Sequence, residues 1–111
     1  MGTFVRGDVV VADFPYDDLS SSKRRPTLVV AQLEGDRVLL CQVTSQQITD
    51  KYPVQLQETD FEIGSIQRQS VIRTNVLFSA NASLIQYRAG RIKNQKLQEV
   101  VSKLVGILTE T

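Results

Sequence analysis

The chain has 111 residues but no histidine, no tryptophan and only one cysteine. Without histidine and without a second thiol, the common zinc sites and the histidine-activated nucleophiles are excluded. Any catalysis must therefore depend on hydroxyl groups, carboxylates, lysines and arginines, and we expect neither a metal nor another cofactor. Cys41 has no partner for a disulfide within one chain, and its place in the apolar run RVLLCQVTS predicts a small buried core residue.

Long hydrophobic runs are also missing. No segment approaches the ~20 apolar residues of a membrane-spanning helix, and the start MGTFVRGD lacks the charged-then-apolar order of a secretory signal. We therefore expect a cytoplasmic protein that does not contact a membrane. The length, with 41% hydrophobic and 23% charged residues, predicts a single globular domain over residues 1–111.

The net charge of +1 hides an uneven distribution of charge along the chain. Ten of the twelve carboxylates lie within residues 1–62, together with six of the thirteen lysines and arginines. Two explanations are open: the basic C-terminal half faces an anionic ligand, or the two halves attract each other within the fold.

Apolar and β-branched runs predict strands through most of the chain. The first covers residues 8–14, and two more, 26–33 and 37–45, are joined by the tight turn EGD. The alternating segment 51–57 predicts an edge strand, whereas TDFEIGS is typical of a turn. The segment 70–80 predicts a further strand, with a bend where its alternation is imperfect.

The C-terminal segment has a different period. From Asn94, a predicted N-cap, apolar residues recur at helical spacing and form a stripe that predicts packing against the core, and Gly106 predicts fraying near the helix end. The stripe consists of Leu97, Val100, Val101, Leu104, Val105 and Leu108. Strands followed by one helix predict a mainly β fold, in which an antiparallel sheet curls into a small barrel and the helix closes one side.

Three cations precede the second predicted strand, in SSSKRRPTLVV. Each repels the next, so either the segment is simply solvated or something anionic binds there. Arg25 has a third option, which is to pair with Asp17 or Asp18 of the preceding polar loop.

Several segments, in order, resemble the MazF/PemK family of toxins from bacterial toxin–antitoxin pairs. They are RGDVVVADFPYDD, RRPTLVVAQ, LLCQVTSQ, SVIRTNVLF and AGRIKNQKLQEVVSKLVGIL, and together they span almost the whole chain. The resemblance implies an SH3-like barrel that forms a homodimer and cuts single-stranded RNA at short sequences without a metal. It also implies a cognate antitoxin protein as partner.

The resemblance also implies roles for individual residues. The arginine of the RP motif is Arg25 and the threonine after the third strand is Thr44, which would be the catalytic pair. Ser45 and Gln46 adjoin Thr44 and would line the site. Arg73, in VIRTN, matches a basic position of some branches, but those branches have an aspartate two places later, where this chain has asparagine.

RNA cleavage by transesterification builds extra negative charge on a pentacoordinate phosphorus. An arginine fits that task because its planar fork binds two phosphate oxygens and stays charged, so Arg25 is predicted to stabilise this charge. Thr44 is predicted to donate or position a hydrogen bond at the same phosphate. The acceptor of the 2′-hydroxyl proton stays open between a water, a phosphate oxygen and a carboxylate such as Asp13.

The loop that follows the first strand supplies further candidate RNA contacts. Lys23 and Arg24 are predicted to hold flanking phosphates, while Phe14 or Tyr16 stacks on a base. Each has a structural alternative: the two cations as a solvated face and Phe14 as a core residue. Likewise, Thr44 is alternatively an ordinary strand residue, and Asp13 a turn cap.

The alternative function is a non-catalytic barrel that binds nucleic acid or poisons DNA gyrase. A barrel of that kind does not require Arg25 and Thr44 at these positions, so their presence favours the ribonuclease.

Overall fold

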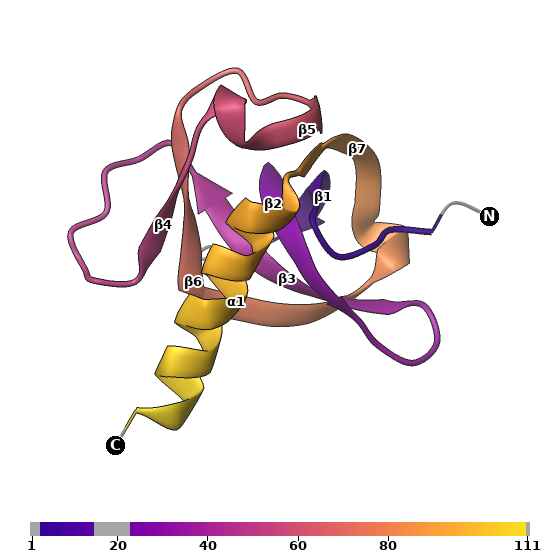
Figure 1. Cartoon of the computed structure of the whole chain (residues 1–111). Helices are drawn as coiled ribbons and strands as arrows, with labels where there is room; N and C mark the ends of the chain where they lie inside the picture. Colours follow the sequence, from indigo (N-terminus) through magenta and orange to yellow (C-terminus); the bar gives the residue numbers. More distant parts are fainter. Residues whose placement is uncertain (1–2, 15–22, 111) are drawn as a thin grey trace.

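The computed structural model describes residues 3–14 and 23–110. In these residues, seven antiparallel strands form one strongly curled sheet, which one α-helix crosses on one side (Figure 1). The strands are β1 (Asp8–Phe14), β2 (Lys23–Gln32), β3 (Arg37–Thr44), β4 (Pro53–Leu56), β5 (Phe61–Gly64), β6 (Ser70–Asn81) and β7 (Ile85–Ile92), and the helix is α1 (Asn94–Thr109). Their order across the sheet is β4-β6-β3-β2-β1-β7-β5. This half-barrel with a C-terminal helix confirms the predicted fold class.

The first half of the sheet follows the sequence pattern closely. β1 has the predicted bounds, β2 and β3 form the predicted hairpin, and β4 is an edge strand. At the hairpin turn, Gly35 adopts φ +68°, a left-handed conformation that side chains with a Cβ adopt at a cost.

Two strands escaped the sequence analysis. β5 lies in the segment expected to be a turn, where it follows a short 3-10 helix (Glu58–Asp60), and β7 was not predicted at all. Three of the eight residues of β7 are exposed in one run, so its sequence has little apolar alternation, and pairing with β1 fixes it as a strand. β5 approaches β7 so closely that a Cβ on Gly90 would lie 2.5 Å from the carbonyl oxygen of Ile63.

The bend predicted in the sixth strand is confirmed by its register. Cys41 of β3 pairs with Leu77, but the next residue, Gln42, pairs with Arg73. The three residues 74–76 of β6 therefore bulge out of the ladder, which bends the strand.

Apolar side chains pack on both faces of the curled sheet. One cluster, around Leu28, Val43 and Ile72, includes Leu97 and Val100 of α1, and the second includes Val29 and Leu40 on the opposite face. Cys41 is fully buried in the first cluster, as predicted, and desolvation raises the pKa of its thiol from 9.0 to about 12.

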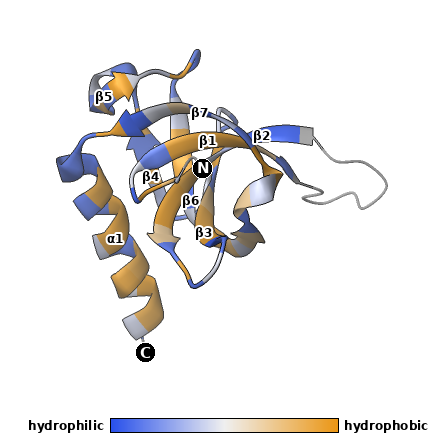
Figure 2. Ribbon diagram, turned by 90° about the vertical axis from the view of Figure 1, so that its right-hand side faces the viewer, coloured by the Kyte–Doolittle hydropathy of each residue, from blue (hydrophilic) through white to orange (hydrophobic). Residues whose placement is uncertain are grey.

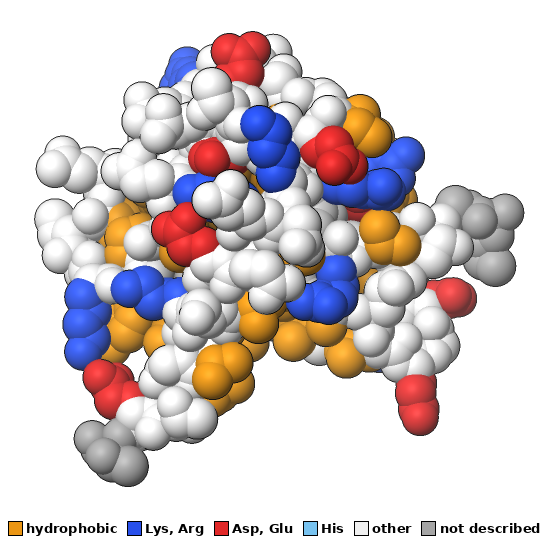
Figure 3. Space-filling view, in the orientation of Figure 1, with side chains coloured by type: hydrophobic (Ala, Val, Ile, Leu, Met, Phe, Trp, Pro, Cys, Tyr) orange, Lys and Arg blue, Asp and Glu red, His pale blue; other side chains and the backbone are white. Residues whose placement is uncertain are grey.

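The helix differs from its prediction in two respects. Asn94 is its first residue and Lys93 is the N-cap, and the helix ends at Thr109. The apolar stripe is buried only in part, because Leu108 is 76% exposed. In Figure 2 the C-terminal half of α1 extends away from the sheet, and in Figure 3 hydrophobic side chains are exposed on the lower part of the face that carries α1.

Within the part of the chain that the structure describes, no helix has the length and apolar character needed to cross a membrane.

Candidate active site

Two neighbouring strands carry Arg25 and Thr44 to the end of the hairpin farthest from its turn. The register of β2 and β3 ends at the pair Thr27 and Gln42, and Arg25 and Thr44 lie two residues beyond that pair. Because side chains alternate along a strand, these four project from one face of the sheet. Arg25 and Thr44 are both half-buried, whereas Thr27, on the same face, is fully buried.

β6 brings a second arginine to the same face. Gln42 pairs with Arg73 and Thr44 pairs with Val71, so Arg73 lies beside β3 on the side away from β2. We call this face, with Arg25, Thr44 and Arg73, the site face. It lies opposite the core cluster of Leu28, Val43 and Ile72, whose side chains alternate with those of the site residues.

The hydroxyl of Thr44 is held by the turn that ends β3. The backbone N–H of Gln46 donates to Thr44 Oγ1 at 3.1 Å, which fixes the side chain over the start of the next segment. Since the oxygen accepts this bond, its hydroxyl proton stays available for a second acceptor. Ser45 and Gln46 are both exposed and follow Thr44 directly, so their predicted position beside it is compatible with the structure.

Arg73 has a carboxylate partner that the sequence analysis missed. Its Nη2 lies 3.4 Å from Oδ2 of Asp50, and the two side chains are 27% and 33% exposed. Its Nε is buried and has no hydrogen-bond partner among the described residues. Asn75 lies exposed in the bulge of β6. The sequence does contain a signal for Asp50, the polar segment ITDKYP. An aspartate in such a segment can accept a hydrogen bond from the backbone two residues later and so close a turn.

Asp13 is not brought together with Arg25 and Thr44. In the ladder of β1 and β2, Asp13 pairs with Arg24 and its neighbour Ala12 pairs with Arg25, so alternation places Asp13 and Arg24 on the face opposite Arg25. Asp13 Oδ2 accepts a hydrogen bond from Gln86 Nε2 at 2.9 Å. Arg24 is exposed.

The remaining loop candidates fall largely outside the described residues. Phe14 and Lys23 form the last pair of the ladder between β1 and β2, but the structure does not describe their side chains. Tyr16, Asp17 and Asp18 lie outside the described residues altogether. The predicted stacking and loop ion pairs therefore stay predictions.

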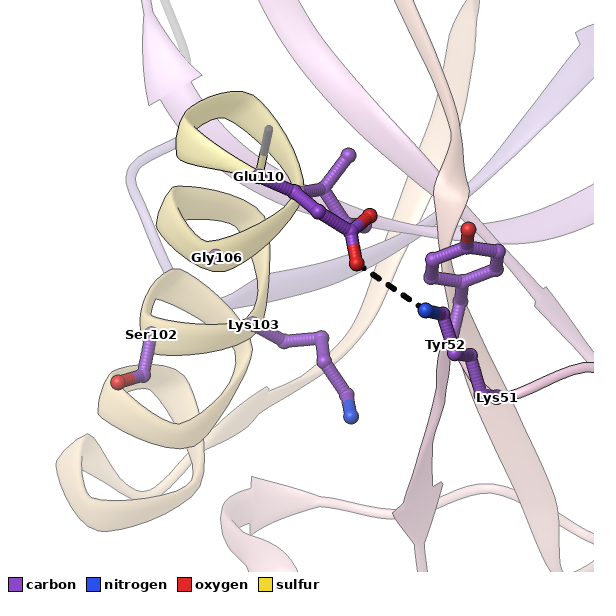
Figure 4. A pocket seen from close by; sticks show the side chains of 7 residues that line it. Lys51, Tyr52, Ser102, Lys103, Gly106 and Glu110 are labelled. Atoms are coloured by element: carbon purple, nitrogen blue, oxygen red, sulfur yellow. Dashed lines mark hydrogen bonds and ion pairs between the residues drawn. The ribbon is translucent and has the colours of Figure 1, made fainter.

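One hollow in the described surface lies away from the site face. It is a shallow pocket of about 280 Å³ between α1 and the segment before β4, lined by Lys51, Tyr52 and residues of the last two turns of α1 (Figure 4). Lys51 Nζ and Glu110 Oε1 form an ion pair of 3.1 Å across it. Glu110 raises the pKa of Lys51 through this hydrogen bond. The ion pair links α1 to the segment that carries Asp50.

Among residues 3–14 and 23–110, acidic and thiol side chains do not form a metal site, because no group of three or more Cys, Asp or Glu side chains is arranged to hold an ion. The site face instead presents two guanidinium groups and a hydroxyl, a donor set that suits an anionic ligand.

Known structures share this fold over their full length. The chain is similar to MazE-MazF from Deinococcus radiodurans, with a TM-score of 0.78 at 19% identity over 99% of this chain and 100% of that one. MazF alone from the same organism has a TM-score of 0.77 at 20% identity, over 97% of this chain and 98% of that chain. An endoribonuclease in complex with its cognate antitoxin from Mycobacterial species has a TM-score of 0.73 at 13% identity, over 98% of both chains.

The sequence comparisons identify the family. No curated protein sequence matches the chain at a significant level. The family model described as PemK-like, MazF-like toxin of type II toxin-antitoxin system matches residues 5–108, which is nearly the whole chain. The resemblance seen in the sequence is thereby confirmed, and the chain belongs to the family of PemK-like, MazF-like toxins of type II toxin–antitoxin systems.

Proposed function

We propose that this toxin is an endoribonuclease that cuts single-stranded RNA at short sequences by transesterification, without a metal. The observation that carries the proposal is the placement of Arg25 and Thr44 on one face of the sheet, at the open end of one hairpin. These are the two residues that match the catalytic motifs of the family, and two structural neighbours are endoribonucleases.

In the proposed reaction, the 2′-hydroxyl oxygen forms a bond to the neighbouring phosphorus while the bond from phosphorus to the 5′-oxygen breaks. The products are a 2′,3′-cyclic phosphate and a 5′-hydroxyl. Arg25 binds two phosphate oxygens as negative charge builds on them, and its permanent charge supplies this stabilisation at any physiological pH. Thr44 donates a hydrogen bond from its hydroxyl to the same phosphate.

The proton of the 2′-hydroxyl needs an acceptor at the site. Asp13 is bonded to Gln86 on the other face, so we do not assign it this role. Arg25 cannot take the proton because it is already protonated. In the mechanism we propose, a water or a non-bridging phosphate oxygen takes it, and the leaving 5′-oxygen takes a proton in turn.

The proposed partners are a cognate antitoxin and a second copy of the toxin. Two neighbouring structures are complexes with an antitoxin, which supports an antitoxin segment lying over the site face. Acidic residues of that segment would complement Arg25 and Arg73. Light scattering tests the homodimer: a dimer mass at micromolar concentration supports it, and a monomer mass contradicts it.

Incubation of the purified protein with a labelled single-stranded RNA in EDTA tests the function. The expected result is a set of discrete fragments that end in 2′,3′-cyclic phosphate, and Arg25→Ala is expected to abolish them. RNA that stays intact with the wild-type protein would contradict the proposal and favour the alternative, a barrel that binds nucleic acid or gyrase without cleavage.

A further inference from the structure

We propose that Asp50 is a positioning residue that holds Arg73 in place to bind the RNA phosphate next to the scissile one. The inference rests on the proposed ribonuclease function and extends its site to a second phosphate. The Arg73–Asp50 ion pair of 3.4 Å carries it, since this pair joins the β3–β4 segment to the site face.

Three interactions fix the segment that carries Asp50. Asp50 Oδ1 accepts a hydrogen bond from the backbone N–H of Tyr52 at 3.0 Å. The carbonyl of Tyr52 accepts from the hydroxyl of Thr74, a buried residue of β6, at 2.8 Å. Lys51, between them, pairs with Glu110 of the helix end (Figure 4). The carboxylate of Asp50 is therefore held by its own turn, and its second oxygen, Oδ2, is directed at Arg73.

Arg73 stands at the right place for a neighbouring phosphate. It lies on β6 and Arg25 lies on β2, with β3 between them, so their backbones are separated by two strand spacings, about 10 Å. Both side chains are long and project from the site face. An RNA strand that crosses β3 near Thr44 can thus meet one guanidinium at the scissile phosphate and the other at an adjacent phosphate.

A free arginine side chain loses much rotamer freedom when it binds, and a carboxylate that already holds it reduces that loss. Asp50 contacts Arg73 at Nη2, and Nε is buried, so a phosphate would bind through Nη1 and the second N–H of Nη2. The net charge of the pair is zero, however, so the carboxylate also repels RNA. The two effects act in opposite directions, which makes the role of Asp50 measurable.

The test compares Asp50→Asn with Asp36→Asn. Asparagine keeps the side-chain oxygen that accepts from Tyr52 N–H but removes the charge that holds Arg73. Asp36→Asn makes the same change in the exposed hairpin turn, at the far end of β3. The probe is a 2′-O-methyl copy of a cleaved single-stranded RNA, which binds but lacks the attacking hydroxyl. Unchanged thermal unfolding of both variants establishes that the fold is intact.

We expect Asp50→Asn to weaken binding of this probe about fivefold to tenfold, which is less than the roughly 10-fold or more of a lost charge-assisted hydrogen bond, because Arg73 itself remains. Arg73→Ala should weaken it at least as much, and should reduce the slope of log K against log salt by about 0.7, the value for one phosphate contact on a single strand. Adding Asp50→Asn to Arg73→Ala should then have no further weakening effect. Asp36→Asn should leave binding unchanged.

Binding that is unchanged or tighter in Asp50→Asn would overturn the inference, because it would mean that the carboxylate only repels RNA. An additive double variant would overturn it as well. Failure of the proposed ribonuclease function would give a different result, namely wild-type protein that leaves RNA intact. If Arg25→Ala abolishes cleavage while Asp50→Asn binds and cleaves normally, the function stands and the inference alone fails.

Discussion

The two ends of the β2–β3 hairpin have similar residues but different surroundings. At the closed end, a turn joins the strands and exposed Arg37 donates from Nε to Ser79 Oγ at 3.1 Å. At the open end, the ladder stops at Thr27 and Gln42, and each strand continues beside a different neighbour, β2 beside β1 and β3 beside β6. The open end therefore brings polar side chains of separate strands together at the point where the pairing of β2 with β3 stops.

Removing an arginine from each end should give the largest contrast. We expect Arg25→Ala to lower kcat/KM for RNA cleavage by at least about 10³-fold, because the developing phosphate charge loses its main donor. Arg37→Ala removes the same side chain from the closed end and should cleave like the wild-type protein. Both are measured by initial rates on labelled RNA. Equal losses in the two variants would mean that an arginine at the open end contributes no more to cleavage than one at the closed end.

Thr44→Val keeps the shape of the side chain but removes the hydroxyl. We expect a loss of about 10-fold to 100-fold in kcat/KM, the range of one hydrogen bond to a charged group. Thr44→Ser keeps the hydroxyl and should retain most of the activity. Cleavage rates of the two variants check this. Full activity of Thr44→Val would show that the hydroxyl of Thr44 takes no part in cleavage.

Cys41, in the buried middle of β3, should affect the stability of the fold but not RNA cleavage. Burial raises the pKa of Cys41 from 9.0 to about 12, so the unfolded chain loses the thiol proton at a lower pH than the folded chain. The contribution of the neutral thiol to stability is fully present below about pH 9 and is lost progressively as the pH rises toward 12. Thermal unfolding should show a larger drop in Tm between pH 8 and pH 10 in the wild type than in Cys41→Ala. Equal drops would contradict the assignment of this titration to Cys41.

Much of the fold that creates the two ends of the hairpin was predictable from the sequence. The β-branched run of β1, the EGD turn and the apolar strand around Cys41 fix the hairpin, because local pattern and burial agree there. β7 was missed since its strand conformation depends on pairing with β1, a partner distant in sequence. The exposed end of the apolar stripe in α1 also escaped prediction, because periodicity shows that a stripe exists but not how far the sheet covers it.

The candidate site, too, was predictable from the sequence only in part. Arg25, Thr44 and Arg73 were predicted because they match motifs, and the register of β2, β3 and β6 at this end of the sheet sets the face they share. The orientation of Asp13 depends on the register of β1 against β2, which the sequence of the intervening loop does not reveal. Asp50 reaches Arg73 from a segment 23 residues away, through a turn that only the folded chain defines.

A double-mutant cycle on kcat/KM measures whether Arg25 and Thr44 act on one phosphate. If both side chains hold the same phosphate, Arg25→Ala with Thr44→Val should cleave RNA scarcely more slowly than Arg25→Ala alone. If the two losses instead multiply, the residues act independently, and the shared site at the open end of the hairpin is contradicted.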